Sequence, residues 1–396
     1  MSVSLTIFQS SYLIATNRDL LEQILVCLPV KSLLRFKCIS KKWLFLISDA
    51  FFIQEHCKRN HHPKRFSIPG ILCSAGNKRP VSEMIFLDGY VGVPFTFNTP
   101  AFFDDPTGIV ISQSCNGLFC CRSDMFNKAS EIYIYIFNPS TNHCKVLPTY
   151  DQQMVNMGFH VISISLAFDP IKSSNYEVVV TWSYGRTKRN GRCKYHITIY
   201  SSKTNSWRLS GDVIYAPEYD LSKSGVFWNG LLHWLTMDET QVVYFDFDQE
   251  SFNILALPSP PDAPRLAYKT KRIKYFRECR GNLYVIQTFV HELVGCFDIL
   301  EVKVDYTGWN IKYHVDLRGL TRGYPEISNV SDFSVLYVHE MEGQESSSKL
   351  VLRASNKVIS YDVEDASFKE IQDLQQNLYG VIADKAFPYV ESLVCV

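Results

Sequence analysis

The sequence predicts a multidomain α+β protein in which a small all-α head precedes an all-β domain, a β-propeller of about six blades. Three observations predict this fold class. The 396 residues are 46% hydrophobic and 14% aromatic, which is enough for more than one buried core. Apolar residues follow helical spacing in the first part of the chain. The rest repeats a short unit of strand, polar turn and strand.

The charge composition excludes a global electrostatic field as the means of finding a partner. Lys and Arg number 40, Asp and Glu number 40, and the net charge is zero. We therefore expect neither nucleic acid nor a membrane as the partner. No run approaches the roughly 20 apolar residues that a membrane helix needs. Residues 1–16 lack the basic start of a secretory signal and are expected to be an N-terminal lead-in.

The cysteines indicate a reducing compartment. The chain has twelve, and no two of them form a C-x-x-C pair. Such cysteines are typical of small buried side chains rather than of a metal site or a disulfide framework. We therefore expect the protein in the cytoplasm or the nucleus, without a metal or another cofactor.

The head is predicted to form four short helices. In the first, one helical stripe has the spacing i, i+1, i+4, i+5, i+8, and its members are Leu20, Leu21, Ile24, Leu25 and Leu28. Thr16 and Asn17 are candidate caps, and Pro29 ends this helix. A second helix starts near Ser32, Ser40 caps a third, and a fourth opens at Asp49.

The head is richer in large apolar residues than its own core can bury. A unit of about 40 residues rarely folds alone without a metal, a disulfide or a partner. The centre of the third helix, Trp43 to Ile47, is apolar on every side, so it must be covered from two directions. Between Lys31 and Arg65 the chain has nine Lys or Arg and two acidic residues. We therefore expect the head to dock on an acidic partner.

The string from Asp19 to Trp43, DLLEQILVCLPVKSLLRFKCISKKW, resembles the F-box of plant F-box proteins, and the resemblance covers residues 17–56. It implies that the head docks on the Skp1-type adaptor of a cullin-RING ubiquitin ligase while the rest of the chain selects a protein substrate. The resemblance also implies a set of adaptor-facing residues: Leu20, Leu21, Ile24, Leu25, Leu28, Pro29, Leu33, Leu34, Arg35, Cys38, Ser40 and Trp43.

Two points qualify the interpretation of the head. The family usually opens with a Leu-Pro pair, whereas this chain has Thr16-Asn17. One apolar anchor is therefore missing, which is expected to weaken docking. The helical spacing alone favours an ordinary helical subdomain packed on the rest of the same chain, and it is the match to the F-box string that favours docking instead.

Residues 57–65 are polar and basic and contain a proline, so they are predicted to be a linker between the head and residues 66–396. His56, Cys57, His61 and His62 could be taken for zinc ligands. Their spacing fits no standard structural zinc site, so the linker interpretation is favoured.

The C-terminal region repeats an aromatic-rich strand, a polar turn and a second strand. Aligned turn positions lie 47 to 63 residues apart, and they are Asn138, Ser201, Asp248, Asp305 and Asp362. Tight turns at Asn116-Gly117, Asn229-Gly230 and Gly281-Asn282 precede several copies. A period near the roughly 40 to 50 residues of known blades favours a propeller over a β-sandwich.

The same region resembles the F-box-associated domain of plant F-box proteins, which is related to kelch-type propellers. The segments that carry this resemblance are Ser112–Leu118, Phe137–Thr141, Phe168–Pro170 and Tyr389–Leu393. The resemblance implies a substrate-binding propeller over residues 66–396.

The search for chemistry yields no catalytic motif. The phosphate-binding loops and the G-x-S-x-G elbow are missing from the sequence. His291-Glu292 and His339-Glu340 lack the second histidine of a zinc motif, and Asp246, Asp248 and Glu250 are expected to be turn residues rather than calcium ligands. We expect Trp207, Trp228, Trp234 and Trp309 to pack between blades, with a recognition surface as the alternative. The basic segment Gly185–Lys194 is expected to be a solvated hairpin loop. The basic run Lys269, Lys271, Arg272 and Lys274 likewise indicates no specific ligand.

The sequence thus predicts a non-catalytic substrate-recognition subunit of an SCF-type E3 ubiquitin ligase. The alternatives are a propeller enzyme with a helical appendage and a module that binds a glycan or another small molecule. An enzyme would need two close carboxylates, or a His and an acid, around the central channel.

Overall fold

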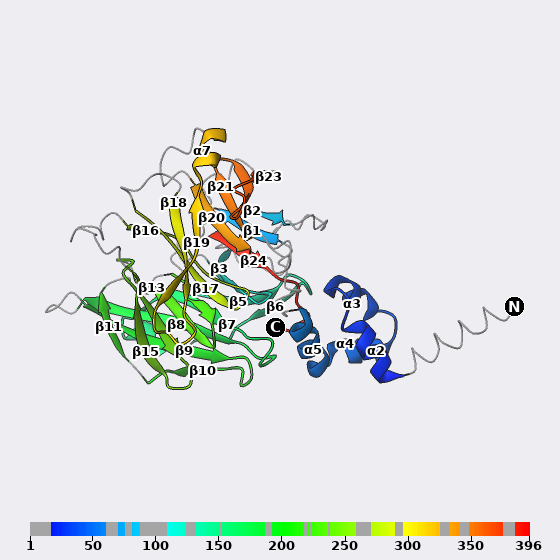
Figure 1. The fold of residues 1–396 in the computed structure, drawn as a ribbon. Helices are drawn as coiled ribbons and strands as arrows, with labels where there is room; N and C mark the ends of the chain where they lie inside the picture. The colour runs from blue at the N-terminus through cyan, green and yellow to red at the C-terminus, as the bar shows by residue number, and fades with distance from the viewer. Residues whose placement is uncertain are drawn as a thin grey trace.

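The computed structural model describes residues 17–60, 70–75, 81–87, 109–123, 132–150, 152–186, 192–211, 213–217, 221, 223–236, 238–258, 271–289, 296–324, 333–339, 348–374 and 385–396. The helical head lies beside a ring of β-sheets, and the C-terminus lies next to the head (Figure 1). The expected lead-in at 1–16 and residues 61–65 of the predicted linker lie outside the described residues.

The head contains four helices, as the sequence predicts, and these are α2 (Arg18–Leu25), α3 (Val30–Phe36), α4 (Lys41–Ser48) and α5 (Ala50–Asn60). Asn17 caps α2, because its side chain accepts hydrogen bonds from the backbone N–H groups of Asp19 and Leu20. Ser40 caps α4 in the same way. Helix α2 ends at Leu25, earlier than expected, and α5 extends through residues 57–60, which the sequence assigns to the linker.

The β domain is a propeller of six blades, as the sequence predicts. Blade 1 comprises β2 (Val81–Phe86), β1 (Gly70–Ala75) and β24 (Ala386–Tyr389). Blade 2 comprises β3 (Ile109–Cys115), β4 (Leu118–Ser123), β5 (Ile134–Asn138) and β6 (His143–Val146). Blade 3 comprises β7 (His160–Ala167), β8 (Glu177–Arg186), β9 (Arg192–Ser201), β10 (Ser206–Leu209) and β11 (Ile214–Pro217).

Blade 4 comprises β12 (Val226–Trp228), β13 (Leu231–Leu235), β14 (Gln241–Asp246) and β15 (Ser251–Ala256). Blade 5 comprises β16 (Lys271–Cys279), β17 (Asn282–Phe289), β18 (Cys296–Val302) and β19 (Trp309–Asp316). Blade 6 comprises β20 (Phe333–His339), β21 (Lys349–Ala354), β22 (Lys357–Asp362) and β23 (Phe368–Asp373). Two short helices, α6 (Gln152–Asn156) and α7 (Arg318–Gly323), lie in connections.

The ring closes between the two ends of the β domain. The innermost strands β24, β3, β7, β12, β16 and β20 contact one another in this order, and β20 contacts β24. Strand β24 comes from the C-terminus of the chain, yet it pairs antiparallel with β1. Blade 1 is therefore built from both ends, which removes an open edge from the ring.

The repeated turn that the sequence reveals joins the third and fourth strands of blades 2 to 6. In four of these turns an Asx side chain accepts a hydrogen bond from the backbone N–H two residues later, and these acceptors are Asn138, Asp246, Asp305 and Asp362. The second predicted turn joins the first and second strands of blades 2, 4 and 5. Both of its central residues have positive φ, as in Asn116 (46°) and Gly117 (90°). In blade 5 these residues are Arg280 and Gly281, one position before the predicted pair Gly281-Asn282.

Candidate functional site

The predicted adaptor-facing residues divide into three groups by exposure. Leu21, Leu25 and Leu33 are buried in the core. Leu28, Leu34 and Trp43 are half-buried and pack against the same core. The other six are exposed, namely Leu20, Ile24, Pro29, Arg35, Cys38 and Ser40. Only the second and third groups can contact a partner without unfolding the head, and the first group maintains its shape.

Four further apolar side chains of the head are exposed, although the predicted set omits them. They are Ile39 (58% exposed), Leu44 (43%), Phe45 (75%) and Phe51 (65%). Together with Leu20 and Ile24 they form what we call the exposed apolar set. The signal was available in the sequence, because a helix that is apolar on all sides cannot bury every side in a head of this size. Full burial of an exposed side chain of this size contributes about 1.5–3 kcal/mol, and each of these partly exposed side chains contributes a fraction of that when a partner covers it.

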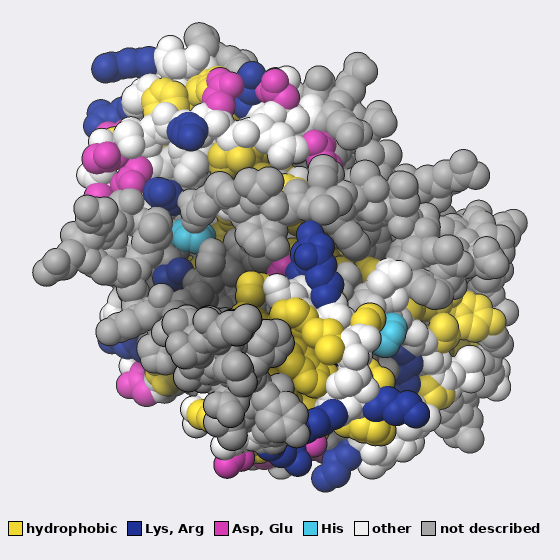
Figure 2. All heavy atoms as spheres, turned by 90° about the vertical axis from the view of Figure 1, so that its right-hand side faces the viewer, with side chains coloured by type: hydrophobic (Ala, Val, Ile, Leu, Met, Phe, Trp, Pro, Cys, Tyr) yellow, Lys and Arg dark blue, Asp and Glu magenta, His cyan; other side chains and the backbone are white. Residues whose placement is uncertain are grey.

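Basic residues accompany the exposed apolar set. Lys31, Arg35, Lys41 and Lys58 are all exposed. Figure 2 turns the head toward the viewer and shows hydrophobic side chains gathered beside Lys and Arg on this face. An apolar surface with a basic surround suits a partner whose contact surface is apolar at its centre and acidic around it.

The head also contacts the propeller. The Gln54 side chain on α5 donates a hydrogen bond to the Ile171 carbonyl oxygen over 2.7 Å. Phe52 and Cys57 of α5 share one buried cluster with Leu393 and Val394 at the C-terminus. The inner side of the head is therefore covered by the propeller and by the C-terminal tail, while its exposed apolar set has no such cover in the described part of the chain.

The four segments that resemble the F-box-associated domain meet next to this contact. The Asn138 side-chain amide donates to the carbonyl oxygens of Ser392 (3.0 Å) and Val394 (2.7 Å), so the turn of blade 2 holds the C-terminal tail. The Asn116 amide donates to the Phe168 carbonyl oxygen over 2.7 Å. A Cβ atom at Gly117 would lie 2.6 Å from the Ser392 Cβ atom, so this turn requires glycine. We call this meeting point the tail junction, and its hydrogen bonds give the segments a structural role.

The tryptophans connect blades, as the sequence predicts. Trp207 in blade 3 donates from its indole N–H to the Pro148 carbonyl oxygen over 2.7 Å. Trp228 and Trp309 make the same kind of bond between blades 4 and 5, to Gly281 and Ala256. Trp234 is fully buried and differs from the other three, because its indole N–H has no hydrogen-bond partner among the residues that the structure describes.

The other candidates for chemistry occupy structural positions. Asp246 accepts backbone hydrogen bonds within its own hairpin, and Glu250 pairs with Arg208 on the neighbouring blade. His56 is buried and bonded to the Leu28 carbonyl oxygen, and burial raises the pKa of the Cys57 thiol to about 12. Across the described ranges, no group of three His, Cys, Asp or Glu side chains could hold a metal ion.

Several of the predicted features fall partly outside the described residues. Residues 187–191 of the basic segment do so, and the strands on either side of them, β8 and β9, form a hairpin. His291, Glu292, Glu340 and Lys269 also lie outside. No helix in the described part of the chain has the length and apolar character needed to cross a membrane.

Comparison with known proteins identifies two family models along the chain. The model for the F-box domain matches residues 17–54. The model for the F-box associated beta propeller domain matches residues 95–299, which is more than half of the chain. The first match coincides with the helical head, and the second covers blades 2 to 4 and part of blade 5.

The curated relatives agree with the family models. F-box protein At5g07610 of Arabidopsis thaliana is 27% identical over 410 residues, which cover 98% of this chain and 94% of the relative. F-box protein At5g49610 of the same plant is 27% identical over 334 residues, which cover 81% of this chain and 86% of the relative. A putative F-box/kelch-repeat protein of Arabidopsis thaliana, At1g12870, is 32% identical over 267 residues, which cover 61% of this chain and 58% of the relative.

Proposed function

Because this chain belongs to the plant F-box proteins that carry an F-box associated beta propeller domain, we propose that it is the substrate-recognition subunit of an SCF-type E3 ubiquitin ligase. The head docks on a Skp1-type adaptor, and the propeller binds a protein substrate. The chain supplies no catalytic residue. It acts by holding an acceptor lysine of the substrate near the ubiquitin-loaded enzyme, which raises the effective concentration of that lysine.

The observation that carries this proposal is the exposed apolar set beside basic residues on the outer side of the head. Six large apolar side chains in one small helical unit are costly to leave in water unless a partner covers them. Adaptor docking gives them that cover. We also propose the cytoplasm or the nucleus as the location, because none of the twelve cysteines, all of which lie in the described ranges, forms a disulfide.

Co-purification with a Skp1-type adaptor tests the docking step. We expect Ile24→Asp and Phe45→Asp each to reduce capture by about tenfold or more, because both place a charge in an apolar contact. The matched control is Ile254→Asp on the outer strand of blade 4, where the side chain is 63% exposed. Undiminished capture by the double variant Ile24→Asp/Phe45→Asp would contradict the proposal. Leu25→Asp is unsuitable for this test, because Leu25 is buried in the head.

Substrate recognition is tested separately by proximity labelling in plant cells. The wild type and the variant Ile24→Asp/Phe45→Asp should label the same candidate substrates through the intact propeller. Only the wild type should label the adaptor and promote ubiquitination of those candidates. If the head variant loses the candidates together with the adaptor, the propeller is not the substrate-binding part.

A further inference from the structure

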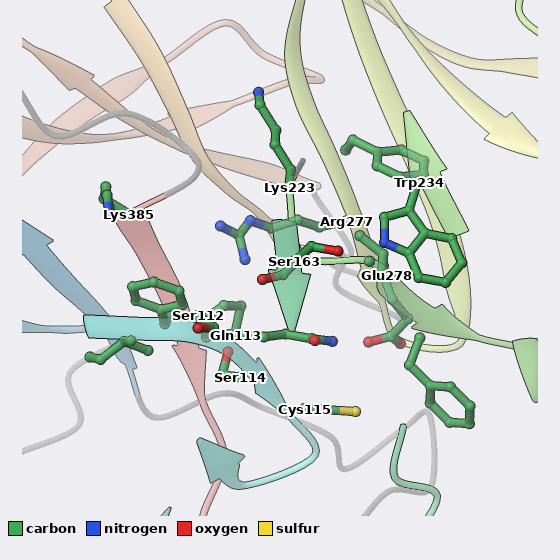
Figure 3. Close-up of a pocket in the computed structure, with 18 of the residues that line it drawn as sticks. Ser112, Gln113, Ser114, Cys115, Ser163, Lys223, Trp234, Arg277, Glu278 and Lys385 are labelled. Atoms are coloured by element: carbon green, nitrogen blue, oxygen red, sulfur yellow. The ribbon is translucent and has the colours of Figure 1, made fainter. Parts of the chain in front are cut away.

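The last residues of the chain run from the interior of the propeller to the head. The first of them line a cavity of about 360 Å³ to which all six blades contribute, and these are Lys385, Phe387, Pro388 and Val390. Figure 3 shows Lys385 in this lining together with Ser114 and Cys115 of β3. Leu393 and Val394, which follow in the C-terminal tail, are buried in a cluster that includes the head. The same segment therefore contacts the interior of the ring and the head.

Blade 2 holds the backbone of the C-terminal tail. At the tail junction the Asn138 amide donates to the carbonyl oxygens of Ser392 and Val394. The Ser392 N–H in turn donates to the Ser140 hydroxyl over 2.9 Å, and that hydroxyl lies 3.2 Å from the Tyr389 hydroxyl. These bonds fix the path of the tail relative to blade 2 before it reaches the head.

The side chains of the tail form the first link between the propeller and the head. Leu393 and Val394 are 0% and 1% exposed, although they lie at the end of the chain, where residues are usually poorly ordered unless they are tied down. They share one buried cluster with Phe52 and Cys57 of α5, and Figure 1 shows the C-terminus beside this helix. The next residue, Cys395, is exposed, so the link ends at Val394.

A second link joins α5 to blade 3. The Gln54 amide donates to the carbonyl oxygens of Ile171 (2.7 Å) and Lys172 (3.4 Å). Both acceptors belong to the connection between β7 and β8. Asp169 shapes this connection, because its carboxylate accepts a hydrogen bond from the Ile171 N–H over 3.0 Å. The head is therefore attached to two different blades, to blade 2 through the tail and to blade 3 through Gln54.

Helix α5 is itself fixed to the rest of the head. His56 is 1% exposed, and its ring N–H donates to the Leu28 carbonyl oxygen over 2.9 Å, beyond the end of α2. Ile53 belongs to the same buried cluster as Leu21 and Leu33. The two links to the propeller therefore act on the whole head and not on α5 alone.

Two links oppose rotation of the head in a way that one link does not. Domains of one chain normally move relative to each other unless their interface is extensive and apolar. Here rotation about the tail would break the Gln54 bonds, and rotation about Gln54 would expose Leu393 and Val394. Orientation matters for a reaction between two bound groups, because it fails when the geometry keeps them apart.

From these two links we propose that Val394 and Gln54 are positioning residues. They fix the orientation of the propeller relative to the head, and so they determine which lysines of a bound protein are ubiquitinated. The consequence for ubiquitination rests on the proposed function, whereas the orientation is a property of the chain alone. A fixed orientation presents the same lysines in every encounter, and a rotating head spreads the reaction over more lysines and lowers the rate at each.

Small-angle X-ray scattering of the full chain tests the orientation without the adaptor. A single arrangement of head and propeller should describe the wild type. Val394→Asp should raise the radius of gyration, because it places a carboxylate in an apolar cluster and releases the tail from α5. The matched control is Cys395→Asp, which adds the same charge at the exposed neighbouring residue and should leave the curve unchanged. If Val394→Asp scatters like the wild type, the tail does not fix the head.

Gln54→Glu tests the second link and leaves the apolar cluster intact. The carboxylate is repelled by the carbonyl oxygens of Ile171 and Lys172, to which the amide donates. Its control is Gln249→Glu in the exposed turn between β14 and β15. We expect the radius of gyration to rise for Gln54→Glu and not for the control. If Val394→Asp does not fold, Gln54→Glu decides the question, and equal curves for it and the wild type would refute the proposal.

A reconstituted ligase tests the consequence, with the lysines of the propeller itself as the acceptor probe. Mass spectrometry maps the modified lysines and their rates. Val394→Asp and Gln54→Glu should capture the adaptor as the wild type does, yet the rate at the main lysine should fall about threefold and further lysines should be modified. Normal capture with the wild-type pattern and rates would show that the two residues do not position the acceptor. Failure of the wild type to capture the adaptor would instead refute the proposed function, and the scattering curves would still decide the orientation.

Discussion

Leu72 of β1 and Phe387 of β24 lie opposite each other in one antiparallel ladder, and both side chains are buried. They join the start of the β domain to its end. The stability of the whole ring therefore depends on a four-residue strand near the C-terminus.

Phe387→Ala should lower the free energy of unfolding by about 3–5 kcal/mol, because it leaves a cavity where the ring closes. Phe368→Ala on β23 is the control, since that ring is 40% exposed and should cost much less. Urea denaturation followed by tryptophan fluorescence measures both values. Equal effects of the two substitutions would contradict the role of β24 in closure.

Asn138→Ala should destabilise the protein by about 2–3 kcal/mol, because it leaves the Ser392 and Val394 carbonyl oxygens without their donor. Limited proteolysis should then release the C-terminal tail before the rest of the propeller is cleaved. Asn310→Ala, at an exposed position on β19, is the matched control and should leave the digestion pattern unchanged.

Glu278 should make stability depend on pH. Burial raises the pKa of its carboxyl from 4.5 to about 7, while the unfolded chain keeps the ordinary value. Between these two pH values the unfolded state has lost the proton and the folded state still binds it, so stability falls as pH rises. Glu278→Gln removes this pH-dependent loss of stability, because glutamine does not ionise. Because Glu278 is half-buried, the advantage of the variant at pH 8 is at most about 3 kcal/mol.

Thermal unfolding of the wild type and of Glu278→Gln between pH 4 and pH 8 measures this difference. The two melting temperatures should coincide near pH 4 and diverge as pH rises toward 7. The hydrogen bond from the Gly281 N–H to Glu278, 2.7 Å long, can be kept by the glutamine carbonyl oxygen. A difference that is constant across this range would contradict the raised pKa.

Lys41→Glu should slow association of the head with the adaptor and reduce its dependence on salt, because Lys41 is exposed on the basic side of the head. Stopped-flow or surface plasmon resonance at several salt concentrations measures this rate. Lys303→Glu, an exposed lysine of blade 5, is the control. An unchanged rate for Lys41→Glu would show that adaptor docking does not use this charge.

The sequence alone predicted those parts of the structure whose conformation is set by neighbouring residues. The hairpin turns were predictable because Asn-Gly pairs and Asx side chains set their own backbone geometry, as at Asn116 and Asn138. The head helices were predictable from spacing and caps. Spacing did not decide which leucines face inward, since Leu20 is exposed and Leu21 is buried although both belong to the same apolar stripe.

Features built from distant segments could not be predicted. Arg277 and Ser163 lie on different blades, so their common cavity depends on the closed ring. The segments Phe137–Thr141 and Tyr389–Leu393 carry the family resemblance, yet nothing in their sequences shows that Asn138 bonds the C-terminal tail. Long-range pairing of this kind depends on tertiary structure rather than on local preference.

The pairing of β1 with β24 also orders the events of biosynthesis. The first strand of the ring leaves the ribosome well before its partner β24, which is translated after the other strands of the ring. The head is translated before the ring, so under the proposed function an adaptor can bind it while the propeller is still open. A protein truncated before residue 385 would contain the complete head but lack β24, so its ring could not close. Such a product would occupy adaptors without a finished receptor.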